Sequence, residues 1–214
     1  MGRPRTPKGR CTRTHDELKI EYPEAECELE HRNSYELLAA TILSAQATDV
    51  SVNKATPKLF NRYPNPEELS VADIEEVESF INSIGLFRGK AKNLVGMAQR
   101  LVEHYEGKVP ESMSDLISLP GVGRKTANVV RSVALGLPGL PVDTHVGRLS
   151  RRIGITDETD PVKIELMLNP MLPAHERGNF SLRVILHGRR VCFARKPNCD
   201  DCVLSYFCPS AFTF

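Results

Sequence analysis

Helix start and stop signals recur along the whole sequence, whereas the alternation of apolar and polar residues that is typical of strands is almost absent. Asn33 and Glu36 make a capping box ahead of an apolar face that includes Leu37 and Ile42. The pair Asn65-Pro66 repeats the start signal, with proline at the first helical position. No repeat at a solenoid period occurs, so the pattern predicts an all-α protein.

The same signals define further helices and two special segments. Helices are predicted over residues 50–62, 73–81, 89–105, 124–135, 143–153 and 160–168, followed by a last helix that reaches Gly188. Residues 1–13 are rich in Arg, Pro and Thr and contain no acid, which predicts a disordered basic arm. The Pro-rich segment 137–141 breaks any helix and predicts a domain boundary, after which the tail packs back on the N-terminal helix.

The stretch Leu119–Val130 joins two of these helices through a hairpin, and the second helix begins with Arg124 and Lys125. Gly121 and Gly123 allow positive φ angles and the close approach of another backbone. The amide groups at the start of the second helix then face outward at the positive end of its dipole, which predicts a phosphate site. A plain helix–helix turn is the alternative, and Gly-x-Gly by itself favours it.

The overall charge does not indicate a nucleic-acid binder, because the net charge is +1 and the pI is near 7.6. Basic residues nevertheless gather near the two ends of the sequence: Arg3, Arg5, Lys8, Arg10 and Arg13 in one group, and Arg183, Arg189, Arg190, Arg195 and Lys196 in the other. Each group fits either a phosphate-binding face or a solvated surface. No apolar run approaches the roughly 18 residues of a membrane span, and no secretory signal is present, so we expect a soluble, intracellular protein without a membrane partner.

Four cysteines lie close together near the C-terminus. Cys192, Cys199, Cys202 and Cys208 are separated by six, two and five residues. In an intracellular chain such a group indicates metal ligands and not disulfides. Zinc is one candidate, although its usual paired Cys-x2-Cys knuckles are not both present. A 4Fe-4S cluster, which needs four cysteines, is the other and suits the wide spacing better. Cys11 and Cys27 lie outside the group and are expected to be unligated thiols.

Residues from about 34 to 208 resemble the endonuclease III family of bifunctional DNA glycosylases and abasic-site lyases. The motifs that carry the resemblance are Leu43–Asp49, Ile84–Leu86, the hairpin with its lysine, Val142–His145, Leu186–Gly188 and the four spaced cysteines. It implies two helical domains around a DNA groove: a six-helix barrel with a helix-hairpin-helix over residues 33–137, and a 4Fe-4S cluster domain formed by residues 14–32 and 138–214. The arm is not covered, and residues 154–180 carry little motif.

Excising a base and cutting at the sugar requires an amine that attacks C1′ and a carboxylate that stabilises the cationic sugar and accepts protons. Lys125 and Asp143 are the pair expected to do this. The helix N-terminus, Arg124 and partial burial are expected to favour the neutral, nucleophilic amine. Asp143 also stands where a helix N-cap belongs, and it can fill both roles. The alternative for Lys125 in this context is that it merely neutralises a phosphate, and His145 and His187 are interpreted as structural.

Reaching a base in duplex DNA requires flipping it out of the stack. The resemblance implies that Gln46 faces the orphan base and that Leu86 fills the vacated space; the alternatives are a helix cap for Gln46 and a core position for Leu86. The Gly121 and Gly123 amides, and Arg195 and Lys196 beside the cluster, are expected to contact phosphates.

The function expected from these residues is base-excision repair of oxidised pyrimidines in double-stranded DNA, with cleavage at abasic sites by β-elimination through a lysine Schiff base. The expected enzyme is a monomer in the bacterial cytoplasm, with the nucleoid. The alternatives are a related glycosylase for another lesion, such as a mismatch or a pyrimidine dimer, and a non-catalytic DNA-binding module. Lys125 disfavours the first alternative, and Lys125 together with Asp143 disfavours the second.

Overall fold

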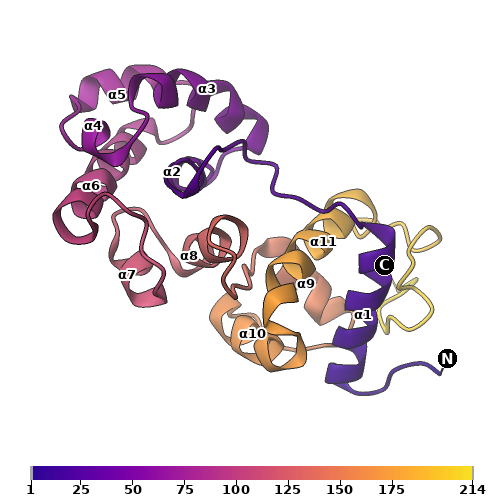
Figure 1. The fold of residues 1–214 in the computed structure, drawn as a ribbon. Coiled ribbons are helices and arrows are strands. Elements are labelled where there is room, and N and C mark those ends of the chain that lie inside the picture. Colours follow the sequence, from indigo (N-terminus) through magenta and orange to yellow (C-terminus); the bar gives the residue numbers. More distant parts are fainter. Residues whose placement is uncertain (1, 214) are drawn as a thin grey trace. The chain divides into compact units, whose positions relative to one another are not determined.

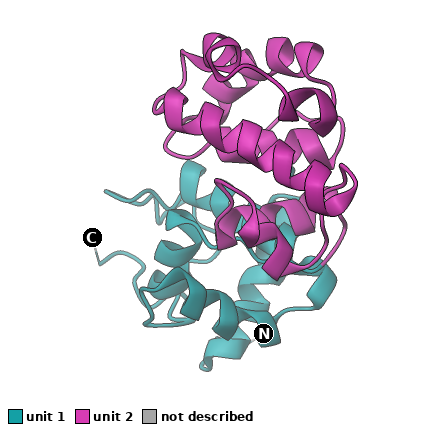
Figure 2. Cartoon of the chain, turned by 90° about the vertical axis from the view of Figure 1, so that its left-hand side faces the viewer, with its two compact units in different colours: residues 1–26, 138–214 teal, residues 27–137 magenta. Residues whose placement is uncertain are grey.

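The computed structural model describes residues 2–213, and this part of the chain is helical and contains no strand. It forms two compact units: unit 1 comprises residues 1–26 and 138–214, and unit 2 comprises residues 27–137 (Figure 2). The later boundary lies at the Pro-rich segment, and the earlier one lies at 26/27, six residues before the expected 32/33. The chain therefore builds unit 1 from both of its ends.

The predicted helices are present, with starts and ends within two residues of the expected positions, except that the helix expected over 124–135 ends as an α-helix at Val129 and continues as a π-helical turn to Ala134. In chain order (Figure 1) the elements are α1 (Pro7–Glu21), α2 (Ser34–Leu43), α3 (Asp49–Arg62), α4 (Pro66–Ser70), α5 (Ile74–Ile81), α6 (Phe87–Tyr105), α7 (Met113–Ser118), α8 (Arg124–Val129), the π-helical turn η1 (Val130–Ala134), α9 (Thr144–Arg152), α10 (Pro161–Leu168), the 3-10 turns η2 (Asn169–Met171) and η3 (Ala174–Glu176), and α11 (Arg177–Arg190).

The central helix of unit 2 is α2, which packs against α3, α6, α8 and η1. Every residue from Tyr35 to Leu43 is buried, as expected for a helix that is apolar on most of its faces. Its predicted cap is present, because the Asn33 side chain accepts a hydrogen bond from the Glu36 amide at 2.9 Å. The Glu36 carboxylate bonds the amide of Arg32 at 2.7 Å, one residue before the position of a standard capping box.

The core of unit 1 lies between α1, α9, α10 and α11, and the expectation of a disordered arm is wrong for residues 7–13, which form the first half of α1. Thr6 caps this helix by accepting a hydrogen bond from the Gly9 amide at 3.1 Å, and Pro7 occupies its first turn. Cys11 and Leu18 are fully buried on one face, so packing against unit 1 orders a segment whose composition alone suggested disorder.

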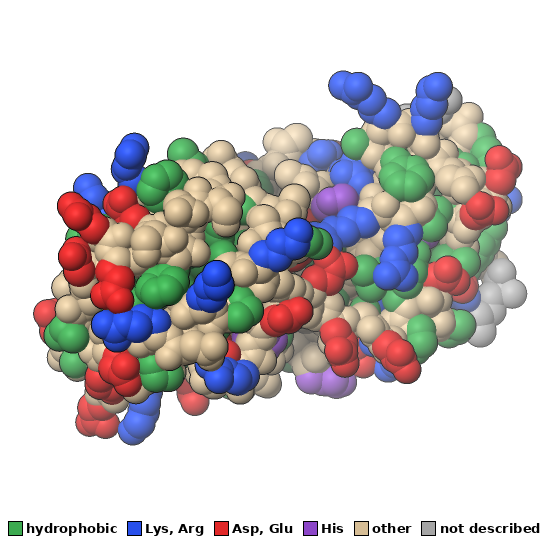
Figure 3. All heavy atoms as spheres, turned by 90° about the horizontal axis from the view of Figure 1, so that it is seen from above, with side chains coloured by type: hydrophobic (Ala, Val, Ile, Leu, Met, Phe, Trp, Pro, Cys, Tyr) green, Lys and Arg blue, Asp and Glu red, His purple; other side chains and the backbone are tan. Residues whose placement is uncertain are grey.

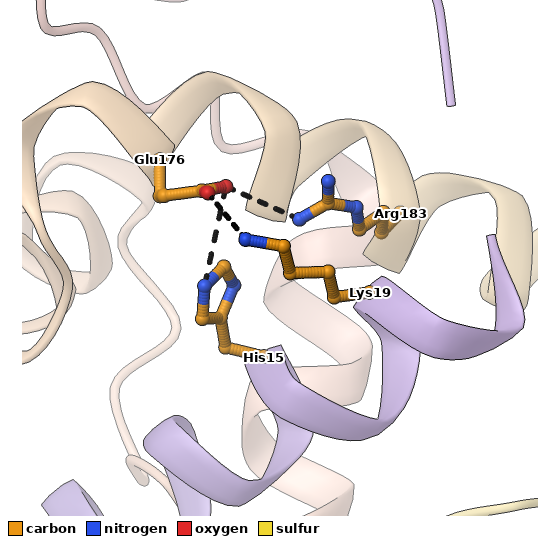
Figure 4. Close-up of polar contacts among 4 residues, drawn as sticks. All are labelled: His15, Lys19, Glu176 and Arg183. Carbon is orange, nitrogen blue, oxygen red and sulfur yellow. Dashed lines mark hydrogen bonds and ion pairs between the residues drawn. The ribbon is translucent and has the colours of Figure 1, made fainter. Parts of the chain in front are cut away.

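A cluster of charged side chains joins α1 to the start of α11 (Figure 4). The Glu176 carboxylate accepts hydrogen bonds from Lys19 Nζ at 2.9 Å and Arg183 Nη1 at 3.2 Å, and His15 Nε2 lies 4.0 Å away. Arg183 is buried, so it does not belong to the basic surface group in which the sequence placed it. On the face drawn in Figure 3, Lys and Arg side chains lie among Asp and Glu side chains, in keeping with the net charge of +1.

Candidate active site and metal centre

The hairpin of unit 2 runs from Leu119, after α7, to Gly123, the N-cap of α8. Gly121 has a φ of +78°, and a Cβ at this position would lie 2.9 Å from the Cβ of Asn93 on α6, so only glycine fits without strain. Gly123 is extended, and a Cβ there would meet no atom within 4 Å. The Gly123 cap makes no side-chain hydrogen bond to the helix amides, and the N-terminus of a helix is an environment that favours anions.

Lys125 lies in the first turn of α8 with its side chain exposed. The expectation of partial burial is wrong, because Ala127 and Asn128 occupy the face of α8 that turns toward the core. Burial raises the pKa of the Cys27 thiol, and the charge of Asp49 raises it further. The charge of Lys125 lowers the same pKa. The amine therefore lies within electrostatic range of this thiol.

Gln46 and Leu86 both adopt the left-handed conformation, with φ angles of 54° and 60°. Gln46 lies shortly after the end of α2, and Leu86 immediately precedes α6. Both side chains are exposed, Leu86 to 67%, so the alternative that Leu86 belongs to the core is wrong. A non-glycine residue in this conformation costs of order 1–3 kcal/mol and is concentrated at functional positions.

Asp143 of unit 1 is the N-cap of α9, as the sequence predicted for its structural role. Its Oδ1 atom accepts hydrogen bonds from the amides of His145 and Val146, both at 2.9 Å. The carboxylate is half-buried. Because Oδ1 makes the cap, Oδ2 remains for a second task. Lys125 belongs to unit 2.

The four predicted cysteines line one cavity of unit 1, together with Arg152, Pro197, Asn198, Ser205, Ser210 and Ala211. Three of the sulfurs face N–H groups: Cys192 faces Arg152 Nη1 at 3.3 Å, Cys202 faces His187 Nε2 at 3.2 Å, and Cys199 faces the Phe212 amide at 3.5 Å. Within residues 2–213, no three His, Cys, Asp or Glu side chains are arranged to hold a single metal ion. Sulfurs that line a shared cavity and face N–H donors fit a thiolate-ligated cluster.

Two arginines of α9 hold the loop that carries the first of these cysteines. Arg148 donates to the carbonyls of Gly188 at 3.0 Å and Cys192 at 2.9 Å. Arg152 donates to the carbonyls of Phe193 at 2.7 Å and Ala194 at 2.9 Å. Arg195 and Lys196 follow in this loop with exposed side chains, the second at a φ of 52°. These loop-holding contacts have no signal in the sequence, because arginines on a helix face usually indicate solvent exposure.

The two histidines without a sequence-derived role both have specific contacts. His145 Nδ1 accepts from Arg148 Nη2 at 3.1 Å, and burial lowers the pKa of His145. A Cβ at Gly188 would come within 2.6 Å of the same Nδ1, which explains why glycine follows His187. Burial lowers the pKa of His187 to about 4. Its Nδ1 lies 3.1 Å from the hydroxyl of Tyr22, opposite the contact of Nε2 with Cys202.

Comparison with known proteins gives consistent matches over most of the chain. Residues 39–173 match the HhH-GPD superfamily of base excision DNA repair proteins, and residues 192–208 match the iron–sulfur binding domain of endonuclease III. The endonuclease III of Synechocystis sp. is 52% identical over 195 residues, which is 91% of this chain and 89% of the relative. The chain belongs to the endonuclease III family. The Bacillus subtilis endonuclease III is 45% identical over 90% of this chain and 89% of its own length.

The fold of this chain also matches solved structures of endonuclease III. A trapped covalent intermediate of endonuclease III with DNA has a TM-score of 0.89 and 43% identity, and the match covers 95% of this chain and 96% of that one. As an endonuclease III family member, the chain is a DNA-binding enzyme of base-excision repair, a DNA glycosylase and abasic-site lyase, and its cofactor is a 4Fe-4S cluster. None of the helices within residues 2–213 is both long and apolar enough to cross a bilayer.

Proposed function

We propose that this enzyme removes oxidised pyrimidines from duplex DNA and cleaves the strand at the resulting abasic site, with Lys125 as the nucleophile and Asp143 as the partner carboxylate. The observation that carries the proposal is an exposed lysine in the first helical turn after a hairpin whose N-cap, Gly123, has no side chain to bond the helix amides. A phosphate bound at those amides brings the neighbouring sugar to the lysine. In the relative trapped with DNA, protein and DNA are joined covalently.

The lone pair of Lys125 Nζ attacks C1′, the glycosidic bond breaks, and the base leaves with the bonding electrons and takes up a proton from water. Asp143 stabilises the positive charge that develops on the sugar and accepts the proton that the ammonium loses. The sugar ring opens as O4′ is protonated, which leaves an iminium at C1′. Removal of a proton from C2′ then expels the 3′ phosphate, and water hydrolyses the iminium to release Lys125.

Borohydride trapping on an abasic duplex tests the lysine. The wild type and Lys92→Ala, which removes another exposed lysine of unit 2, are expected to form a covalent adduct, whereas Lys125→Ala is expected to form none. Equal trapping by Lys125→Ala would show that another amine attacks. For the carboxylate, Asp143→Asn keeps the cap acceptor and removes the charge, so excision should fall by about 100-fold or more while unfolding is unchanged.

We further propose that Gln46 and Leu86 enter the helix at the flipped nucleotide. Their outward side chains on strained backbone support this role. Arg124, Arg195, Lys196 and the Gly121 and Gly123 amides are proposed to hold phosphates. Substrates are damaged bases and abasic sites, the enzyme acts as a monomer, and it works in the cytoplasm with the nucleoid. A panel of single-lesion duplexes tests the substrate, and size-exclusion chromatography tests the monomer.

Cys192, Cys199, Cys202 and Cys208 are the proposed ligands of the 4Fe-4S cluster. Burial raises the pKa of the Cys202 thiol to about 11, so binding iron has to displace its proton. The four cysteines would hold the cluster, which would cross-link the C-terminal loop that carries the exposed Arg195 and Lys196. Substituting any one of the four by serine is expected to lower the iron content of the purified protein.

A further inference from the structure

A buried relay of polar groups leads from α1 through α11 to one of the cysteine sulfurs. Tyr22, at the end of α1, places its hydroxyl 3.1 Å from His187 Nδ1, and His187 Nε2 lies 3.2 Å from Cys202 Sγ. His187 is 1% exposed and Tyr22 is 7% exposed. Helices α1 and α11 pack against each other (Figure 1), so the chain ends of unit 1 meet at this relay.

The chemistry of the two ends fixes the direction of the hydrogen bonds. A thiolate that binds iron has no proton and can only accept. Nε2 must therefore carry the hydrogen, which leaves Nδ1 of a neutral imidazole as an acceptor for the Tyr22 hydroxyl. Both ring nitrogens are then satisfied, as buried polar groups require.

We infer that His187 is a positioning residue for the iron–sulfur cluster: held in one tautomer by Tyr22, it donates an N–H···S hydrogen bond to the Cys202 thiolate. This inference rests on the proposed assignment of Cys202 as a ligand. Hydrogen bonds to the cysteine sulfurs withdraw negative charge from the cluster. They therefore slow the loss of the cluster and stabilise its reduced form. Arg152, which also lines the cavity, places Nη1 3.3 Å from Cys192 Sγ and donates to that sulfur in the same way.

Two substitutions at one position separate the hydrogen bond from the space that the ring fills. His187→Leu removes the donor, whereas His187→Gln keeps an N–H near the position of Nε2. In holoenzyme exposed to air, His187→Leu is expected to lose visible absorbance about tenfold faster than wild type, since a hydrogen bond to a charged group is worth roughly a factor of ten or more. Its cluster potential is expected to shift to more negative values, and its Fe–S(Cys) stretching bands are expected to move. His187→Gln should restore most of each change.

Tyr22→Phe removes only the hydroxyl and keeps the aromatic packing. The cluster potential and the rate of cluster loss should therefore change in the same directions as in His187→Leu, but by smaller amounts. This test remains even if His187→Leu does not fold. His15→Leu is the matched control, because His15 is also a buried histidine where α1 and α11 pack together, but it does not line the cysteine cavity. The cluster potential of His15→Leu should equal that of the wild type. The inference would be overturned if His187→Leu and His187→Gln had the same cluster potential and the same rate of cluster loss. It would also be overturned if Tyr22→Phe had the cluster potential and the rate of cluster loss of the wild type. Full iron content in Cys202→Ser would instead refute the ligand assignment.

Discussion

Replacing Glu176 by glutamine should destabilise unit 1 by an amount set by the burial of its partners. The side chain of Glu176 is 12% exposed and that of Arg183 is 7% exposed, whereas Lys19 is 55% exposed and can turn to water. Breaking a fully buried ion pair costs about 3–5 kcal/mol, because one charge is left without its counterion. Since glutamine still accepts one hydrogen bond, we expect a loss of about 3 kcal/mol in the free energy of unfolding.

Urea denaturation followed by circular dichroism at neutral pH measures this loss. The matched control is Glu158→Gln, which removes a carboxylate that is 40% exposed and lies 3.8 Å from Lys163. An exposed pair of this kind contributes less than about 1 kcal/mol. Adding Arg183→Met to Glu176→Gln should recover most of the stability, because the unpaired buried charge is then removed as well. If Glu176→Gln and Glu158→Gln have the same stability, the reasoning from burial is refuted.

The same cluster makes the stability of unit 1 sensitive to acid. The Lys19 hydrogen bond holds the pKa of Glu176 below its usual value, so this carboxylate stabilises the fold above the pKa of unfolded Glu, about 4.3, and the contribution is lost as the pH falls through the lower folded value. Burial lowers the pKa of His15, which faces Glu176, Arg183, Asp16 and Lys19. The unfolded chain therefore takes up this proton first, and stability should begin to fall below about pH 6.5. A flat profile between pH 7 and 5 would contradict the direction of the His15 shift.

Four further substitutions test the proposed DNA-binding elements. Gly121→Ala should cost about 1–3 kcal/mol of stability, because φ is +78° and the new Cβ meets Asn93. Gly123→Ala, whose new Cβ lies in open space, should cost less than about 1 kcal/mol. Equal losses of stability in urea denaturation would contradict the hairpin geometry. Leu86→Ala should change stability by no more than about 0.5 kcal/mol, since the side chain is 67% exposed, while lowering excision from duplex but not from single-stranded substrates. Arg195→Ala should weaken duplex binding and reduce the salt slope by about 1, as measured by fluorescence anisotropy; an unchanged slope would exclude a phosphate contact.

The hairpin shows which features of the site the local sequence predicts and which it does not. Gly121 adopts the positive φ that the sequence allows, and Arg124 begins a helix as the sequence predicts. The sequence does not predict the exposure of Lys125, because which face of α8 turns inward depends on what packs against Ala127 and Asn128. It also does not decide between a surface and a core position for Leu86, since an isolated leucine fits both equally well in a linear pattern.

The sequence alone determined the all-helical class, the positions of the helices, the Pro-rich boundary and the spacing of the four cysteines, because capping, proline and glycine effects act over a few neighbouring residues. Only the tertiary structure decided that residues 7–13 are helical, that Arg183 is buried on Glu176, and that Tyr22 and His187 lead to Cys202. Helix α1 packs against α11, and Tyr22 is 165 residues away from His187; burial between segments so far apart leaves no local pattern that marks which partners will meet.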